Sequence, residues 1–407
     1  MQPPLVLLGA GASAPAGIPT AVKMTSDMLA LASGHHDPLV GRTMHVICGT
    51  LQTYAAARGL SRAFMPDIER VLDATHQLRD RDDLELTPFI SAWNPAILAL
   101  RESSFANSGP VIAKMAVSEL SRIDRFGTID HRDLVDCLEH AFRTLADELG
   151  DDKNPPNWIP FEKLRMFLIN KLIELVWLNS SDNLSYLKPL IKNGQHGSII
   201  IATLNYDNTI EMKALEESVP IETGIQSWIT TGLLGNAPNG IELIKLHGSL
   251  DWVWREPSVF NSERPPHKYI CQLQADEMKD RLKSVNSGTI HLDGSPAIIF
   301  GGRNKLTAEG PFLDLLIQFR KRLLENDRLI VIGYSFRDNH INALIEFWLR
   351  RTDVHMTIID RPNGTVVDNE FVAELPMEFR SRIKYEPSGA ETGIATHFGE
   401  LPESRSS

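Results

Sequence analysis

Two side chains capable of acid–base and hydrogen-bonding chemistry each follow a short apolar segment. Asn205 comes directly after residues 198–204, and His247 comes directly after residues 242–246. An imidazole has an ordinary pKa of about 6.5, which suits a general base near neutral pH. A carboxamide donates and accepts hydrogen bonds at once, so it can orient a water and a hydroxyl together. From residue type alone, a structural histidine beside a tight turn at Gly248 is the better interpretation of His247.

A glycine-rich segment follows the first apolar run of the chain. Residues 4–8 are apolar, and Gly9-Ala10-Gly11-Ala12-Ser13 comes next, before an expected helix start. A turn of this kind lets the backbone approach a pyrophosphate and directs N–H groups at it, and the Ser13 hydroxyl adds a contact. The third glycine of a GxGxxG pattern is missing, because Ala14 stands in its place. A tight strand–helix turn without a ligand is therefore the alternative.

Small or polar residues also follow the later apolar segments. Ligands gather at the carboxyl ends of the strands in an open parallel sheet, so these residues are candidates for one shared site. Asp207 can order a ribose or cap the helix expected to begin after it, and the cap is the favoured role. Asp360 can hold the adenosine ribose, as can Ser335, or it can begin an ordinary turn. The candidate cofactor contacts at these ends are Asp207, Gly333, Tyr334, Ser335 and Asp360.

The elements that must position these residues form an interrupted α/β pattern. Apolar runs at 198–204, 242–246, 297–300, 328–333, 355–360 and 382–385 predict strands, and helical periodicities separate the later ones. Such alternation predicts a Rossmann-like parallel sheet with helices on both faces. Helical spacing dominates from about residue 20 to residue 193, which predicts a large all-helical insertion after the first strand. The expected domains are 1–22 with 195–390 (Rossmann-like), 23–194 (helical) and 391–407 (a polar tail).

Composition narrows the possible partners and compartments. The net charge of −11, from 52 acidic and 41 basic residues, disfavours direct nucleic-acid binding. Cys48, Cys137 and Cys271 are too scattered for a disulfide framework or a zinc site, so no metal is expected. A signal peptide requires a positively charged start, but no Lys or Arg precedes Lys23. No apolar stretch is long enough to span a membrane. These features predict a soluble, cytoplasmic protein.

Four segments, taken in order, resemble the sirtuins, the silent-information-regulator-two family. The segment GAGASAPAGIP (9–19) resembles the signature GAGxSxxxGIP and adds Ile18 and Pro19 to the expected cofactor contacts. TLNYD (203–207) is similar to the family's TQNID, and LHGS (246–249) contains its His-Gly. GYSFRDNHIN (333–342) resembles an element of sirtuin-like domains in bacterial NAD-consuming defence proteins.

The resemblance implies an NAD glycohydrolase that releases nicotinamide and ADP-ribose, with Asn205 and His247 as its catalytic residues. Deacylase sirtuins carry a module of four zinc-binding cysteines, whereas only Cys271 lies between His247 and the next strand. They also have Phe-Arg after GIP, where this sequence has Thr20-Ala21. Both departures favour the hydrolase branch. The resemblance further implies antiphage defence by NAD depletion, a homo-oligomer, and a HerA-type ATPase or another sensor protein as partner.

Two other functions remain open at this point. One is NAD-dependent protein deacylation, and the other is a non-catalytic module that senses NAD or ADP-ribose. The choice between NAD and NADP also stays open, because no basic residue can be placed beside the adenosine ribose. For the hydrolase, we expect His247→Ala to abolish NAD cleavage, as loss of a general base costs roughly 10²–10⁴ in rate, and to leave the melting temperature nearly unchanged.

Overall fold

The computed structural model describes nine stretches of the chain and divides it into two compact units. The described residues are 4–59, 65–81, 159–195, 199–235, 239–255, 268–286, 294–299, 309–361 and 369–399. The first unit comprises residues 1–20, 173–299 and 304–407, and the second comprises 21–172 with 300–303. The first unit holds every candidate site residue predicted from the sequence.

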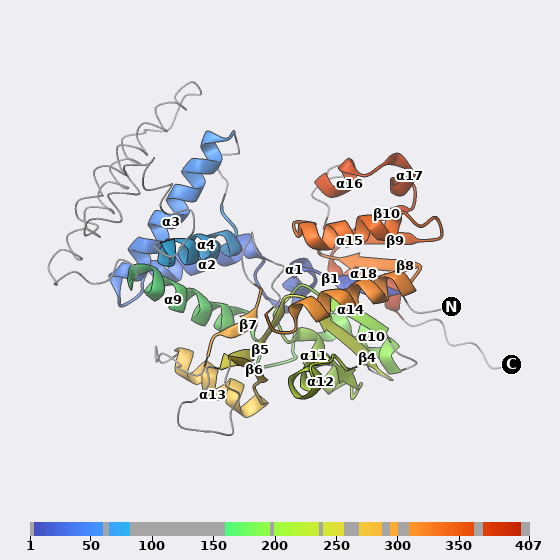
Figure 1. The fold of residues 1–407 in the computed structure, drawn as a ribbon, viewed down its shortest axis with the longest axis horizontal. Helices are drawn as coiled ribbons and strands as arrows, with labels where there is room; N and C mark the ends of the chain where they lie inside the picture. The colour runs from blue at the N-terminus through green and yellow to red at the C-terminus, as the bar shows by residue number, and fades with distance from the viewer. Residues whose placement is uncertain are drawn as a thin grey trace. The chain divides into compact units, whose positions relative to one another are not determined.

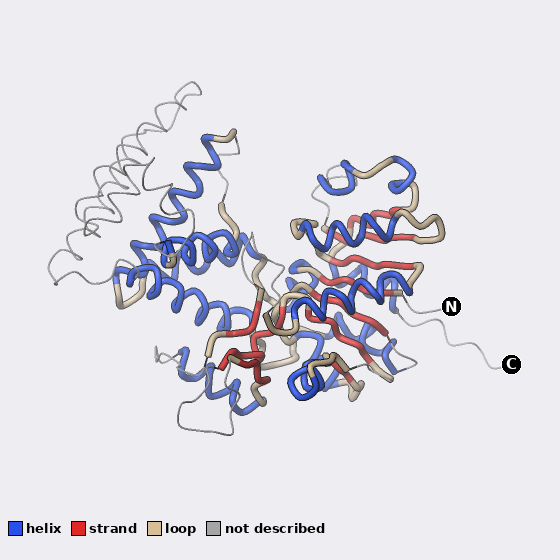
Figure 2. The backbone as a smooth tube through the Cα atoms, in the orientation of Figure 1, coloured by secondary structure: helices blue, strands red, loops and turns tan. Residues whose placement is uncertain are grey.

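A seven-stranded sheet, entirely parallel, forms the centre of the first unit (Figure 2). Its spatial order is β10-β9-β8-β1-β2-β4-β3, so the chain builds outward from β1 first on one side and later on the other. The order reverses between β1 and β8, and ligands of open α/β sheets bind at such a switch point. The strands are β1 (Leu5–Leu8), β2 (Ile199–Thr203), β3 (Ile221–Glu222), β4 (Ile241–Lys245), β8 (Arg328–Ile332), β9 (His355–Asp360) and β10 (Ile383–Pro387).

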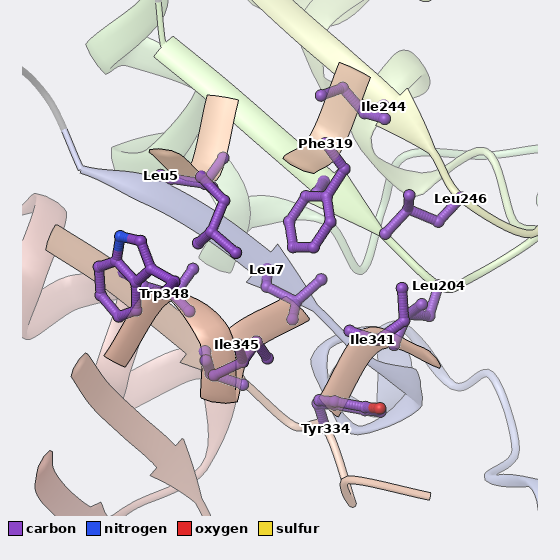
Figure 3. Packing of buried hydrophobic residues seen from close by; sticks show 14 of the residues in the cluster. Leu5, Leu7, Leu204, Ile244, Leu246, Phe319, Tyr334, Ile341, Ile345 and Trp348 are labelled. Carbon is purple, nitrogen blue, oxygen red and sulfur yellow. The ribbon is translucent and has the colours of Figure 1, made fainter. Parts of the chain in front are cut away.

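Both faces of this sheet are covered by helices, which the alternation of side chains along β1 makes clear. Leu5 and Leu7 join one buried cluster, while Val6 and Leu8 join another on the opposite face. The first cluster includes side chains of α14 (Phe312–Glu325) and α15 (Asn339–Leu349), and Figure 3 shows Phe319 and Trp348 packed around Leu5 and Leu7. The second includes α10 (Lys188–Lys192), α11 (Thr209–Glu216) and α18 (Ala390–Phe398). The predicted Rossmann-like fold class is confirmed.

A second, antiparallel sheet contains the segment predicted at 297–300. Its order is β6-β5-β7, with β5 (Gly248–Arg255) between β6 (Tyr269–Gln272) and β7 (Pro296–Ile298). The sequence-based placement of 297–300 in the parallel sheet is therefore wrong. A short apolar run indicates a strand but does not identify its partner, and here β5 supplies the pairing.

The second unit is helical in all its described parts, as predicted for the insertion between β1 and β2 (Figure 1). Asp37 caps α3 by accepting the N–H of Leu39, and Asp67 caps α4 by accepting the N–H of Arg70. The expected helices and breaks between residues 82 and 158 lie outside the described residues. The helices are α2 (Ala21–Ser33), α3 (Pro38–Ala57), α4 (Ile68–Arg79) and α9 (Ile159–Val176), whose last residues belong to the first unit.

Two boundaries differ from the sequence-based prediction. Residues 173–194 belong with the sheet, because Leu184, Leu187 and Ile191 are buried in the same cluster as Val6. The prediction of a polar tail from residue 391 is also wrong, because α18 buries Ile394 and Phe398 in that cluster. The sequence of α18 is rich in glycine, threonine and glutamate, and only a few of its side chains are buried. Its buried face is therefore not evident from the sequence.

The remaining helices lie between the main elements along the chain. No helix in the described part of the chain combines the length and apolar character needed to cross a membrane. The connecting elements are α1 (Ala10–Ser13), η1 (Ala14–Ala16), η5 (Ser185–Leu187), η6 (Asn193–Gln195), α12 (Ile225–Thr231), α13 (Ala275–Asn286), α16 (Glu370–Glu374) and α17 (Met377–Arg380).

Candidate functional site

The glycine-rich loop after β1 packs directly on the end of β8. The N–H of Gly9 donates to the carbonyl of Ile332 at 3.0 Å, and the N–H of Gly11 donates to the carbonyl of Gly333 at 2.9 Å. The N–H of Ala12 donates to the carbonyl of Gly9 at 2.9 Å. These three amides are therefore used within the protein, and the close approach of two backbones is the immediate reason for the glycines.

Substitution of Gly9 is expected to destabilise the first unit. A Cβ at Gly9 would lie 2.6 Å from the carbonyl oxygen of Gly333 and 2.6 Å from the Cα of Tyr334, both backbone atoms that cannot move aside. We expect Gly9→Ala to lower the free energy of unfolding by about 3 kcal/mol, the upper range for overpacking. Gly389→Ala is the matched control, because its nearest neighbour is 3.8 Å away and its φ is −70°. Urea denaturation checks both variants, and equal stabilities would contradict the packing argument.

Asn205 is anchored to this loop from the neighbouring strand. Its side-chain nitrogen donates to the carbonyl of Gly9 at 3.0 Å and to the hydroxyl of Ser13 at 2.9 Å. Its backbone N–H donates to the Thr203 hydroxyl at 3.0 Å. Since β1 and β2 are parallel neighbours, Asn205 emerges at the same edge of the sheet as the glycine-rich loop. The carboxamide is held in one orientation by two partners.

Asp207 connects the same loop to the following helix. One carboxylate oxygen accepts the hydroxyl of Ser13 at 2.6 Å, and the other accepts the N–H and the hydroxyl of Thr209 at 3.0 and 2.6 Å. The side chain is 5% exposed. Asp207 thus accepts the N–H of Thr209, the first residue of α11, from one position before the N-cap residue Asn208, and it fixes the hydroxyl that Asn205 contacts.

Lys245 holds the Asn205–Asp207 segment in place from the neighbouring strand β4. The sequence does not single it out, because it is one lysine in a largely apolar run. Its ammonium group donates to the carbonyl of Asp207 and to the carboxylate of Glu211, both at 2.6 Å. Its side chain is 1% exposed. Burial opposes the charge, but Glu211, Asp251 and Asp207 outweigh it and raise the pKa of Lys245. A buried cation therefore holds the Asn205–Asp207 segment against β4.

Removing the Lys245 charge is expected to destabilise the protein strongly. Lys245→Met leaves the Glu211 carboxylate and the Asp207 carbonyl without their cation, and breaking a buried pair in this way costs about 3 kcal/mol. Lys384→Met is the control, because the Lys384–Glu386 pair has a lysine side chain that is 71% exposed. Chemical denaturation should show recovery in the double variant Lys245→Met/Glu211→Leu. A single variant as stable as wild type would contradict the support role.

His247 emerges beside Asn205 from the next strand of the sheet. Thr203 and Lys245 are paired in register, and each candidate lies two residues after one of them. His247 is 2% exposed, with the ring of Tyr206 stacked at 6.3 Å and the ring of His340 at 5.9 Å. Its Nε2 lies 3.9 Å from a carboxylate oxygen of Asp338. Tyr206, the residue after Asn205, thus connects the two predicted catalytic side chains.

The other predicted residues occupy different environments. The Tyr334 hydroxyl accepts the N–H of Asp338 at 3.1 Å and donates to Asn342 at 3.0 Å, and its ring is buried among Ile341 and Leu204 (Figure 3). Tyr334 therefore shapes the loop after β8. Gly333, with a φ of +61°, allows that loop to turn against Gly11.

Four predicted contacts are not joined to Asn205 or His247 by the interactions described above. Ser335 is exposed, Ile18 is buried and Pro19 is half-buried. Asp360 ends β9 and accepts the N–H of Arg361 at 2.8 Å. Burial raises the pKa of Asp360 above its ordinary value. Their roles in holding a nucleotide remain predictions.

Sequence reasoning missed three further residues of this edge. Asp338 and His340 lie within the segment GYSFRDNHIN, so their motif was visible but their contact with His247 was not. The Tyr186 hydroxyl donates to the carbonyl of Ala12 at 2.7 Å and so braces α1, and no motif surrounds it. Burial raises the pKa of Tyr186, which keeps it a hydrogen-bond donor. Among the described residues, no cluster of three or more His, Cys, Asp or Glu could hold a metal ion.

Comparison with known proteins gives one family match over part of the chain and distant similarities to solved structures. The family described as SIR2-like domain matches residues 199–375. No curated protein matches the chain. A structure of Sir2Tm bound to a propionylated peptide is 13% identical, with 97% of this chain and 91% of that chain covered and a TM-score of 0.35. A Sir2–p53 peptide–NAD⁺ structure is 12% identical, with 97% and 91% covered and a TM-score of 0.36.

Proposed function

We propose that this protein hydrolyses NAD at the bond between nicotinamide and ribose. The observation that carries the proposal is the position of Asn205, hydrogen-bonded to the glycine-rich loop, beside His247 at the same edge of the sheet. The sirtuin-like segments of the sequence and the SIR2-like domain match at 199–375 support the choice of NAD as substrate.

The proposed reaction needs one base and one orienting group. Cleavage of the glycosidic bond gives an oxocarbenium-like ribose, and nicotinamide leaves as a neutral molecule, so no acid is required for departure. Water then adds to C1′ of the ribose, and its proton passes to the imidazole of His247. Asn205 orients that water and a ribose hydroxyl by accepting from both through its side-chain oxygen, because its nitrogen donates to Gly9 and Ser13. The products are nicotinamide, ADP-ribose and one proton.

Burial of His247 supports a resting state that must open before the reaction. With 2% of the side chain exposed, the groups that cover His247 must shift for a ribose to reach it. An NAD hydrolase without such control would drain the cell of its cofactor. We therefore propose activity gated by an assembly partner, in antiphage defence by NAD depletion. A homo-oligomer paired with a HerA-type ATPase or another sensor fits this proposal, and gel filtration with and without the candidate partner tests it.

The deciding experiment incubates the purified chain, alone and with its candidate partner, with NAD and separates the products by chromatography. Nicotinamide and ADP-ribose without any acyl acceptor support the proposal. Turnover only in the presence of an acetyl-lysine peptide replaces it with deacylation. Tight binding of NAD without products, in the presence of the partner as well, replaces it with nucleotide sensing. His247→Gln serves as the blank for each assay.

A further inference from the structure

Asp338 occupies a helix-capping position without making the capping hydrogen bond. It is the residue before α15, where an aspartate commonly accepts an N–H from the first turn and stabilises the helix by about 1 kcal/mol. Its side chain makes no such bond. The capping carboxylates of Asp37 and Asp67, in contrast, accept the N–H groups of Leu39 and Arg70. The Asp338 side chain therefore does not cap α15.

The loop before α15 holds this residue firmly. The N–H of Asp338 donates to the Tyr334 hydroxyl at 3.1 Å, and its carbonyl accepts the N–H groups of Ile341 and Asn342 at 3.0 and 2.9 Å. The backbone at Phe336 has a φ of +55°, a strained conformation for a bulky residue. A tight, strained turn thus fixes the point from which the Asp338 side chain projects.

The carboxylate is directed at His247. A distance of 3.9 Å separates its Oδ1 from the His247 Nε2, and the two side chains are 9% and 2% exposed. In the part of the chain that the structure describes, the titratable neighbours of His247 include Asp338, His340 and Tyr206, and Asp338 is the acidic one of these three. An anion at this distance favours the protonated imidazole, whereas burial of the ring opposes it. Pairs of this kind also shorten when a substrate binds.

We infer that Asp338 is the positioning residue of His247. Its carboxylate orients the imidazole and stabilises the imidazolium that forms when His247 takes a proton. The inference deepens the proposed NAD hydrolysis and rests on it for the catalytic consequence. The electrostatic coupling of Asp338 to His247 is a property of the folded protein and can be measured without any substrate.

The experiment measures the pKa of His247 by NMR on protein with ¹³C-labelled histidine, using His247→Gln to assign the signal. In Asp338→Asn, which keeps the side-chain volume and the ability to cap a helix, we expect this pKa to fall by about one pH unit. Asp314→Asn is the matched control. It removes the same charge from a carboxylate on α14, one that accepts the indole N–H of Trp228. An unchanged His247 pKa in Asp338→Asn would overturn the inference, whatever the protein's activity.

Kinetics add a second readout if the wild type cleaves NAD. Asp338→Asn should lower kcat by more than tenfold with little change in KM, and the acid limb of kcat/KM should move to lower pH with the pKa of His247. Asp338→Ser, which can also cap α15, should show the same loss. A wild-type level of kcat in either variant would overturn a role in positioning. A wild type that does not cleave NAD even in the presence of its partner would overturn the proposed function and leave the NMR result to decide the pairing.

Discussion

His247→Gln is expected to lower kcat for NAD cleavage by about 10²–10⁴-fold, the usual loss when a general base is removed. Glutamine keeps a polar side chain of similar reach but cannot take a proton near neutral pH. The measurement is the initial rate of nicotinamide release, with binding of NAD followed separately. His355→Gln is the matched control, because His355 is an exposed histidine at the first residue of β9, at the opposite edge of the sheet. A normal rate in His247→Gln would remove His247 from the mechanism.

The burial of His247 changes the expectation formed from the sequence for His247→Ala. From the sequence alone, a nearly unchanged melting temperature is expected for this variant. The structure places the ring beside Tyr206 and His340 with 2% exposure, so alanine would leave a cavity. We now expect His247→Ala to lose stability as well as activity. Thermal denaturation of the Ala and Gln variants side by side separates the two effects.

Asn205→Asp is expected to lower kcat/KM by at least about 10²-fold, the loss that follows a small displacement of a reacting group. The substitution replaces the donor that contacts the Gly9 carbonyl and the Ser13 hydroxyl by an acceptor. The Ser13 hydroxyl already donates to Asp207, so two carboxylates would compete for one hydrogen. The side chain should therefore leave the glycine-rich loop. Steady-state kinetics of NAD cleavage measure the loss.

The matched control for this variant is Asn193→Asp. The Asn193 amide also donates to a backbone carbonyl, that of Pro189 at 2.8 Å, but at an exposed position outside the site. Its rate should equal that of wild type. Equal activity of Asn205→Asp and wild type would show that the carboxamide neither orients the water nor depends on its anchor.

Local sequence patterns predict the strands of the main sheet well, but they do not predict which strands pair with each other. The runs 198–204, 328–333 and 355–360 are strands within one or two residues of their predicted bounds. Residues buried on both faces must be apolar throughout, so parallel strands are visible without any knowledge of their neighbours. The run 297–300 has the same composition but pairs antiparallel with β5, because pairing depends on contacts far away in the sequence.

For the candidate site too, the sequence predicts some features and only the structure shows others. That Asn205, His247 and the glycine-rich loop lie at one edge follows from their positions after parallel strands. Which groups they contact does not follow: the Gly9 and Gly11 amides donate to the carbonyls of Ile332 and Gly333, whereas the sequence-based hypothesis directs them at a phosphate. These amides donate within the protein because the backbone of Gly333, more than 300 positions later in the chain, lies close to them.

The sequence by itself determined the fold class, the helical insertion after β1 and the order of the polar strand ends, because each depends on periodicity and turn chemistry over a few residues. Tertiary structure alone decided that Lys245 supports the Asn205 segment, that α18 completes one face of the sheet, and that Asp338 faces His247. Each of these depends on which distant segments share a buried, water-free space. Electrostatic and packing energies are set within that space, so no local pattern records them.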